Sequence, residues 1–268
     1  MRKTYVLYRE ALKHWFARDA NIYAAALAYF TPFALIPLLA VSITLISLVV
    51  SEVLLIDTML RWGNALAPGI TPVVADAVAD FTLSNQYWGV PFVGVLVLAW
   101  VLLSTLSLLV RGLHHIWHIA DEGAWRQIEL FLRSGLFFLL LMMFLTMLVA
   151  ISMLSHELFN ETAMAAVMQR TLVFLLSISF FTIAFGVLTR RPLRLKSRLI
   201  GAVTIAALLL ILRTGFEWWV ATTPAIDLFG AAGVMLGLLL LIYAMAAVIY
   251  FGAAVAYVCD QHAIRGKL

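Results

Sequence analysis

The stretch Ser134–His156, SGLFFLLLMMFLTMLVAISMLSH, decides the fold class because it runs for 23 residues without an Asp, Glu, Lys or Arg. A helix of roughly 20 apolar residues crosses the ~30 Å hydrocarbon core of a bilayer. Polar and apolar residues do not alternate here, as they would in a strand of a membrane barrel. A helix also satisfies its own backbone hydrogen bonds in lipid. The stretch therefore predicts a transmembrane helix.

Similar uncharged runs recur along the whole chain, at 20–51, 81–110, 171–189, 199–212 and 228–259. Hydrophobic residues make up 64% of the chain and charged residues 12%, half of the ~25% charged residues expected in a soluble domain. This balance excludes soluble, disordered, collagen-like and coiled-coil proteins, and the single Cys259 excludes an internal disulfide. We predict an all-α polytopic membrane protein, one domain over 1–268. Its six transmembrane helices are expected at about 32–51, 88–110, 134–154, 171–189, 199–219 and 233–258.

The fifth of these spans needs a charged segment to be long enough. Its uncharged run, 199–212, becomes a full span only if the helix continues past Arg213 toward residue 221. A re-entrant segment is the alternative.

The distribution of Lys and Arg predicts the orientation. With six spans, only Arg61, Arg170 and Arg213 fall on one side, and the remaining 15 of the 18 basic residues fall on the other. Short cytoplasmic loops carry an excess of Lys and Arg. We therefore expect both termini in the cytoplasm. The net charge of +4 then reflects topology rather than nucleic-acid binding, and no nucleic-acid partner is expected.

Two segments outside the spans have helical character. Residues 1–30 predict interfacial N-terminal helices, with Tyr5, Tyr8, Leu12, Trp15 and Phe16 on one face, lying on the anionic inner leaflet. Thr31 and Pro32 look like an N-cap followed by a proline at the first helical position, so the first span is expected to begin at Pro32. The external loop 52–84 predicts short amphipathic helices.

Arg213 and Glu217 are the foremost candidates for function. They lie four residues apart on a predicted helix and can therefore pair. Charges inside a membrane cost ~2.5–3.5 kcal/mol on insertion scales and usually face a partner or water. Either they form a gate or an anion-binding site in a central cavity, or they are a pair at the outer headgroups.

A tyrosine stripe is the second candidate. Tyr243, Tyr250 and Tyr257 recur every seven residues in the last span, and a buried phenol needs a polar partner. We expect Tyr23, Tyr29 and Asn21 to meet this stripe, either as the lining of a substrate pathway or as packing. The glycines of Gly233-x-x-x-Gly237 also match a helix-packing pattern.

Two polar clusters complete the inventory. A metal site is one interpretation of His114 and His118, which lie four residues apart, together with the nearby His115, Asp121 and Glu122. The HExxH signature is absent, however. The alternative is a polar helix end. The basic cluster Arg190, Arg191, Arg194, Lys196 and Arg198 is either a site for phosphorylated ligands or a topology determinant. We expect no catalytic residues, no metal and no cofactor, since the sequence carries no P-loop or nucleophile elbow.

Three stretches resemble the YihY/BrkB family of bacterial inner-membrane proteins. They are AYFTPFALIPLL at 28–39, RGLHHIW at 111–117 and YFGAAVAYV at 250–258. His114 and His115 depart from the family pattern, which more often has Asn and Arg there. The resemblance implies a membrane protein linked to envelope integrity, serum resistance and export of anionic lipid or related solutes. The family once carried the label ribonuclease BN.

We therefore expect a transporter or flippase-like exporter of an anionic lipid or solute, not an enzyme. Its partners would be the bilayer and a small anionic substrate. A non-catalytic envelope scaffold is the alternative, with the external loop and the small-residue face of the last span as binding surfaces. A metal-dependent ribonuclease is third. The sequence leaves the oligomeric state open.

Overall fold

The protein is described by a computed structural model over residues 2–47, 89–119, 126–159, 163–189, 193–222 and 231–264, together with Gly266. Within these ranges the regular structure is helical throughout, which confirms the all-α prediction there. The helices are α1 (Arg2–Ala17), α2 (Ala20–Ser47), α5 (Gly89–Ile116), α6 (Arg126–Phe159), α7 (Ala163–Leu188), α8 (Leu195–Thr222) and α10 (Ala231–Ile264).

In the part of the chain that the structure describes, five helices contain segments long and apolar enough to cross a membrane. These segments are Ala99–Ile116, Glu129–Ile151, Val167–Leu188, Leu195–Trp219 and Met235–Ile264, and they support a protein that crosses the bilayer several times. The remaining predicted span, 32–51, begins in α2, whose side chains are described only as far as Ala34. Six crossings thus stay a prediction, and the external loop 52–84 lies outside the described residues.

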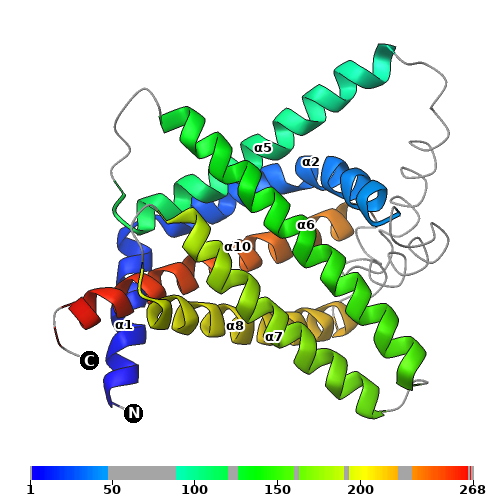
Figure 1. The fold of residues 1–268 in the computed structure, drawn as a ribbon. Coiled ribbons are helices and arrows are strands. Elements are labelled where there is room, and N and C mark those ends of the chain that lie inside the picture. Colours follow the sequence, from blue (N-terminus) through cyan, green and yellow to red (C-terminus); the bar gives the residue numbers. More distant parts are fainter. Residues whose placement is uncertain are drawn as a thin grey trace.

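The long helices run back and forth between two ends of one bundle, and both chain termini lie at the same end (Figure 1). α10 packs against α2 and α8, α5 packs against α2 and α6, and α7 packs against α6 and α8. The helix α1 lies across one end, against α10. We call this the basic end, because the helix termini and turns there carry Arg18, Arg111, Arg133, Arg194 and Arg198.

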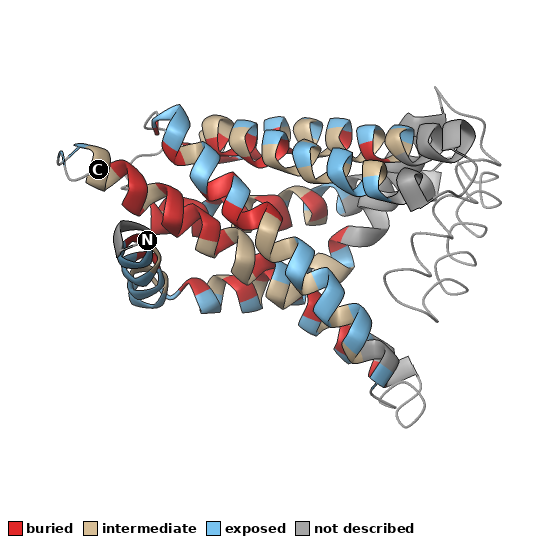
Figure 2. Ribbon diagram, turned by 90° about the horizontal axis from the view of Figure 1, so that it is seen from below, coloured by how far each residue is buried: buried red, intermediate tan, exposed pale blue. Residues whose placement is uncertain are grey.

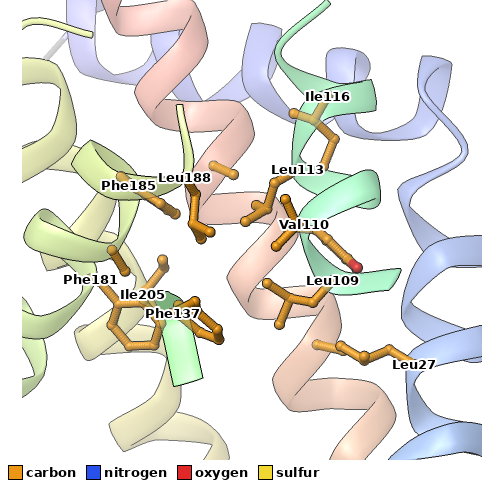
Figure 3. Packing of buried hydrophobic residues seen from close by; sticks show 14 of the residues in the cluster. Leu27, Leu109, Val110, Leu113, Ile116, Phe137, Phe181, Phe185, Leu188 and Ile205 are labelled. Atoms are coloured by element: carbon orange, nitrogen blue, oxygen red, sulfur yellow. The ribbon is translucent and has the colours of Figure 1, made fainter. Parts of the chain in front are cut away.

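The interior of the bundle is filled by apolar side chains from all the long helices. Figure 3 shows Leu113 and Val110 of α5 facing Leu188 and Phe185 of α7. The buried residues concentrate toward the basic end and along the inner sides of the helices (Figure 2). Many large apolar side chains on the outer surface are exposed, Trp100 and Trp218 among them, as expected where lipid replaces water.

The predicted start of a helix at Pro32 is wrong. α2 begins at Ala20 and continues through the proline. The Thr31 hydroxyl does not cap a new helix; it donates a hydrogen bond to the carbonyl of Leu27, 2.6 Å away and one turn earlier. Prolines are tolerated in membrane helices when neighbouring groups satisfy the freed backbone, so the Ala-rich segment 20–30 belongs to the bundle and not to an interfacial helix.

The predicted single apolar face of α1 is also wrong, because the face divides in two. Tyr8 and Trp15 pack inward onto the bundle, while Tyr5, Leu12 and Phe16 are exposed. Leu7 and Ala11, one turn apart on the inner side, are buried and were not part of the predicted face.

The small-residue face of α10 is used inside the bundle. A side chain added at Gly237 would meet the ring of Trp219 at 3.4 Å, and one added at Gly252 would meet Ile205 and the backbone of Gly201. Gly233 is buried as well. These glycines let α8 and α10 approach closely, so they are not an exposed surface for a scaffold partner.

Candidate functional site at the basic end

Three histidines at the end of α5 point in three directions. The helix ends at Ile116, and His118 adopts a left-handed backbone with φ 52°. The amide of Ile119 donates to the carbonyl of His114 at 3.0 Å, which closes the helix in the manner of a Schellman cap. The i, i+4 relation between His114 and His118 holds only inside a helix, so the predicted shared face does not exist.

The first two histidines pack inside the bundle. His114 is buried, and its Nε2 donates to the carbonyl of Leu188 at the end of α7, 2.9 Å away. The His115 ring lies 5.4 Å from the ring of Tyr23 on α2. The two residues thus join α5 to different neighbours.

The third histidine meets α1 and α10. The rings of His118, His14 and Tyr257 lie nearly parallel, with centroids 4.9–5.4 Å apart. The His14 Nε2 donates to the carbonyl of Ile116 at 2.8 Å, and the Arg18 guanidinium reaches the ring nitrogens of His118. We call these four side chains the histidine cluster.

Burial lowers the pKa of both histidines in this cluster below the ordinary value of 6.5. For His14 the loss of hydration is the largest cause; the hydrogen bond to Ile116 opposes it, and the charge of Arg18 adds to it. For His118 the loss of hydration comes first, followed by the charges of Arg18, His14 and His115. Both imidazoles are therefore held in the neutral form more strongly than a free histidine.

The rest of α1 docks on α10 and α8. Leu7 and Ala11 are buried against Val255 and Cys259. The hydroxyls of Tyr8 and Thr204 lie 2.9 Å apart. A further contact joins the Glu10 carboxylate to the His262 Nε2 at 2.6 Å.

The described residues contain no group of three His, Cys, Asp or Glu side chains that could hold a metal ion. Asp121 and Glu122 lie outside them. Of the described histidines, His14, His114, His115 and His118 contact backbone carbonyls, rings and Arg18, and His262 contacts Glu10.

The tyrosine stripe has three different environments. Tyr257 belongs to the histidine cluster, Tyr243 is half-buried, and Tyr250 is fully buried with its hydroxyl against the backbone of Gly112. Tyr23 meets Tyr250 at 6.4 Å between ring centroids, as expected.

The other predicted partners of the stripe lie elsewhere. Tyr29 and Asn21 are exposed, and the Tyr29 ring contacts Phe30 and Phe33 on its own helix. The expectation that they meet the stripe is wrong, because they face away from α10.

Replacing Tyr250 with phenylalanine should not destabilise the protein. The Tyr250 hydroxyl is buried and makes no hydrogen bond among the described residues, and a buried polar group left unpaired costs about 1–3 kcal/mol. We expect an equal or higher midpoint of thermal unfolding in detergent for Tyr250→Phe. A clear loss of stability would instead show that the hydroxyl binds a water or another ligand.

The predicted basic cluster is only partly described, since Arg190 and Arg191 lie outside the described residues. Arg198 turns inward and donates to the carbonyl of Leu193 at 2.7 Å. Arg194 and Lys196 are exposed. The part that is described therefore combines one structural arginine with two cations at the surface.

Arg213 and Glu217 pair as predicted, with 2.8 Å between Nε and Oε1. Their side chains are 56% and 49% exposed, on the outer surface of α8 and away from the apolar interior. The pair lies inside the membrane-length segment that ends at Trp219. Among the described residues, the pair therefore lies on the bundle surface and not in the apolar interior.

Sequence reasoning missed two polar contacts that organise the basic end. The Asp260 carboxylate accepts hydrogen bonds from the Arg194 amide at 3.1 Å and the Ser197 hydroxyl at 3.3 Å, at the start of α8. The indole of Trp117 donates to the carbonyl of Ala253 at 3.1 Å. The sequence could have drawn attention to Asp260, because this charged residue directly follows the long uncharged run 228–259.

Trp117 and Gly112 belong to one of the family-like stretches, and Ala253 and Tyr250 belong to another. The structure brings these two stretches into direct contact.

Comparison with known proteins gives the relatives of the chain. Residues 11–267 match the profile of a family described as "Virulence factor BrkB". A relative named "UPF0761 membrane protein" from Actinobacillus pleuropneumoniae serotype 5b (strain L20) is 24% identical over 257 residues, covering 91% of this chain and 90% of its own length. Another of the same name, from Alkalilimnicola ehrlichii (strain ATCC BAA-1101 / DSM 17681 / MLHE-1), is 26% identical over 247 residues, covering 89% of this chain and 55% of its own length. No solved structure matches the chain.

Proposed function

The chain belongs to the BrkB family of membrane proteins, and from this premise we propose that it moves an anionic lipid across the bacterial cytoplasmic membrane in a flippase-like manner. The observation that carries the proposal is the exposed Arg213–Glu217 pair within an apolar helix segment. A charged pair facing hydrocarbon is costly. A lipid headgroup passing along this surface would solvate the pair.

The packing of the interior favours a lipid over a soluble ion as the substrate. A soluble anion needs a hydrated path through the bundle. In the described residues the interior is instead a continuous cluster of apolar side chains. A lipid needs only a polar groove for its headgroup, because its acyl chains remain in the bilayer.

The orientation completes the proposal. The basic end would face the cytoplasm, since loops rich in Lys and Arg stay on that side. Arg194 and Lys196 are exposed there and would attract anionic headgroups from the inner leaflet. Without an ATP-binding motif, movement would be passive, ion-coupled or driven by a partner.

Substitution of Arg213 tests the proposal. Losing a hydrogen bond to a charged group costs about 1.5–3 kcal/mol, so Arg213→Ala should slow lipid movement by about tenfold or more. The assay reconstitutes the protein in vesicles with a fluorescent phosphatidylglycerol and follows the quenching of outer-leaflet label by dithionite. Arg170→Ala is the matched control, because Arg170 is another exposed arginine, on α7.

Two results would count against lipid movement by this surface. One is wild-type protein that moves no labelled lipid faster than empty vesicles. The other is equal rates for Arg213→Ala and wild type, which would remove the pair from the mechanism. The scaffold alternative then gains weight, although with the α10 glycines covered it depends on the loop 52–84.

A further inference from the structure

We propose that His118 and His14 form a proton-binding site, and that protonation there releases α1 from the basic end of the bundle. The inference goes beyond lipid movement and does not depend on it. It stands on the contacts that hold α1 at the end of α5 and α10.

The contact between Arg18 and His118 requires a neutral imidazole. A guanidinium has only hydrogen-bond donors. Of the two His118 ring nitrogens that it reaches, one can accept, and only in the neutral ring. A protonated histidine has no acceptor. Uptake of one proton by His118 therefore turns an attractive contact with Arg18 into the juxtaposition of two cations.

His14 couples this change to the helix. Its Nε2–H donates to the carbonyl of Ile116, and its ring lies against both His118 and Tyr257. Both histidines cannot be charged at this distance without repelling each other. Proton uptake therefore weakens two contacts between α1 and the end of α5, namely the contact of Arg18 with His118 and the stacking of His14 on His118.

Among the described residues, few other charged groups surround the cluster, and Asp121 and Glu122 lie outside them. His115 lies behind His118 on α5 and its charge also opposes protonation. Tyr257 on α10 stacks on both histidines of the cluster, and Tyr23 on α2 lies against His115. Asp19, in the turn after α1, is exposed.

One contact acts in the opposite direction. The His262 Nε2 lies 2.6 Å from the carboxylate of Glu10, which is 49% exposed, and this contact holds α1 against α10. Solvent screening weakens this pair, and it also weakens the repulsion between Arg18 and a charged His118, whose side chain is exposed. The histidine cluster in addition loses a hydrogen bond and a neutral ring stack. Release also rehydrates the Trp15 indole, which is buried without a hydrogen-bond partner in the described structure.

The sign of the pH dependence follows from linkage. Burial lowers the pKa of His14 and His118 in the docked state, so the released state binds more protons below the ordinary value of about 6.5. Docking is therefore fully favourable above that value and weakens as the pH falls below it.

The fate of the released helix is set by its outer side. Tyr5, Leu12 and Phe16 are exposed, and Arg9 and Lys13 lie beside them. An apolar stripe flanked by cations binds an anionic membrane surface, so α1 would stay at the membrane and uncover the end of α10.

The single cysteine reports this movement. Cys259 is buried beneath Leu7 and Ala11 of α1. In the full-length protein in phosphatidylglycerol-containing vesicles, N-ethylmaleimide labelling of Cys259 is compared at each pH with labelling after unfolding in dodecyl sulfate. This ratio cancels the pH dependence of the thiol itself. We expect the ratio to rise at least about threefold between about pH 7.5 and about pH 5.5.

The double variant His14→Gln/His118→Gln should abolish the rise. Glutamine keeps a donor for Ile116 and an acceptor for Arg18 but does not titrate. His262→Gln is the matched control and should retain or enlarge the rise, because it removes only the opposing pair. An equal rise in wild type and the double variant would overturn the proposal.

Hydrogen exchange of the wild-type protein gives an independent test that needs no variant. We expect the amides of α1 to lose protection relative to those of α8 as the pH falls through this range. Constant relative protection of α1 would overturn the proposal even if the double variant fails to fold.

Discussion

Gly201→Ala should lower the free energy of unfolding by about 1–3 kcal/mol or more, the usual cost of overpacking a close-packed core. A Cβ at this position would lie 2.7 Å from the backbone oxygen of Gly252, 2.8 Å from the Cβ of Ala256 and 3.2 Å from the ring of Phe185. A backbone oxygen cannot rotate away as a flexible side chain can. α8 and α10 must therefore separate, which disturbs the largest helix–helix contact of the bundle.

A second glycine of the same helix is the control for this prediction. Gly215 has nothing within 4 Å of an added Cβ, so Gly215→Ala should be neutral or stabilise α8, because alanine is the better helix former by about 1 kcal/mol. Thermal unfolding in detergent, followed by light scattering or tryptophan fluorescence, compares the two variants. Equal midpoints for Gly201→Ala and Gly215→Ala would contradict the close approach of α8 and α10.

The membrane-length helices could be predicted from the sequence because lipid imposes one simple rule. The predicted spans 134–154 and 171–189 fall on α6 and α7. The helix that carries Arg213 also continues to Thr222. This continuous helix is what a transmembrane span predicts, and a re-entrant segment would interrupt it. The helices are longer than the uncharged runs, since a helix can continue into the polar interface, where charged residues carry no penalty.

Helix starts and faces near the N-terminus were not predictable in the same way. Proline at Pro32 resembled the start of a helix because sequence rules are derived from helices in water. The inward face of α1 was hidden because small residues such as Ala11 mark it, and only the partner helix α10 reveals that they are covered.

The contacts of the candidate site were even harder to predict from the sequence. The sequence could place Arg213 next to Glu217, since that pairing is local to one helix. The histidine cluster joins His14 of α1, His118 in the turn after α5 and Tyr257 of α10. A single sequence predicts the faces of helices but not which helices meet, so contacts over such separations appear only in the folded protein.

Asp260→Ala should be the most damaging change at the basic end, because it removes a buried carboxylate that caps α8. The carboxylate accepts hydrogen bonds from the Arg194 amide and the Ser197 hydroxyl. Losing a helix cap costs about 0.5–2 kcal/mol, and the buried hydroxyl of Ser197 left unpaired adds about 1–3 kcal/mol. We expect a fall in the unfolding midpoint together with faster hydrogen exchange in the first turn of α8.

Asp260→Asn separates the hydrogen bonds from the charge. The amide oxygen of asparagine can still accept from both donors, but it loses the favourable interaction of a negative charge with the N-terminus of α8, worth about 0.3–1 kcal/mol. The asparagine variant should therefore lie between wild type and Asp260→Ala in stability. If Asp260→Ala unfolds at the wild-type midpoint and exchanges its first-turn amides no faster, then α8 is not capped from α10 and the packing of the basic end must have another cause.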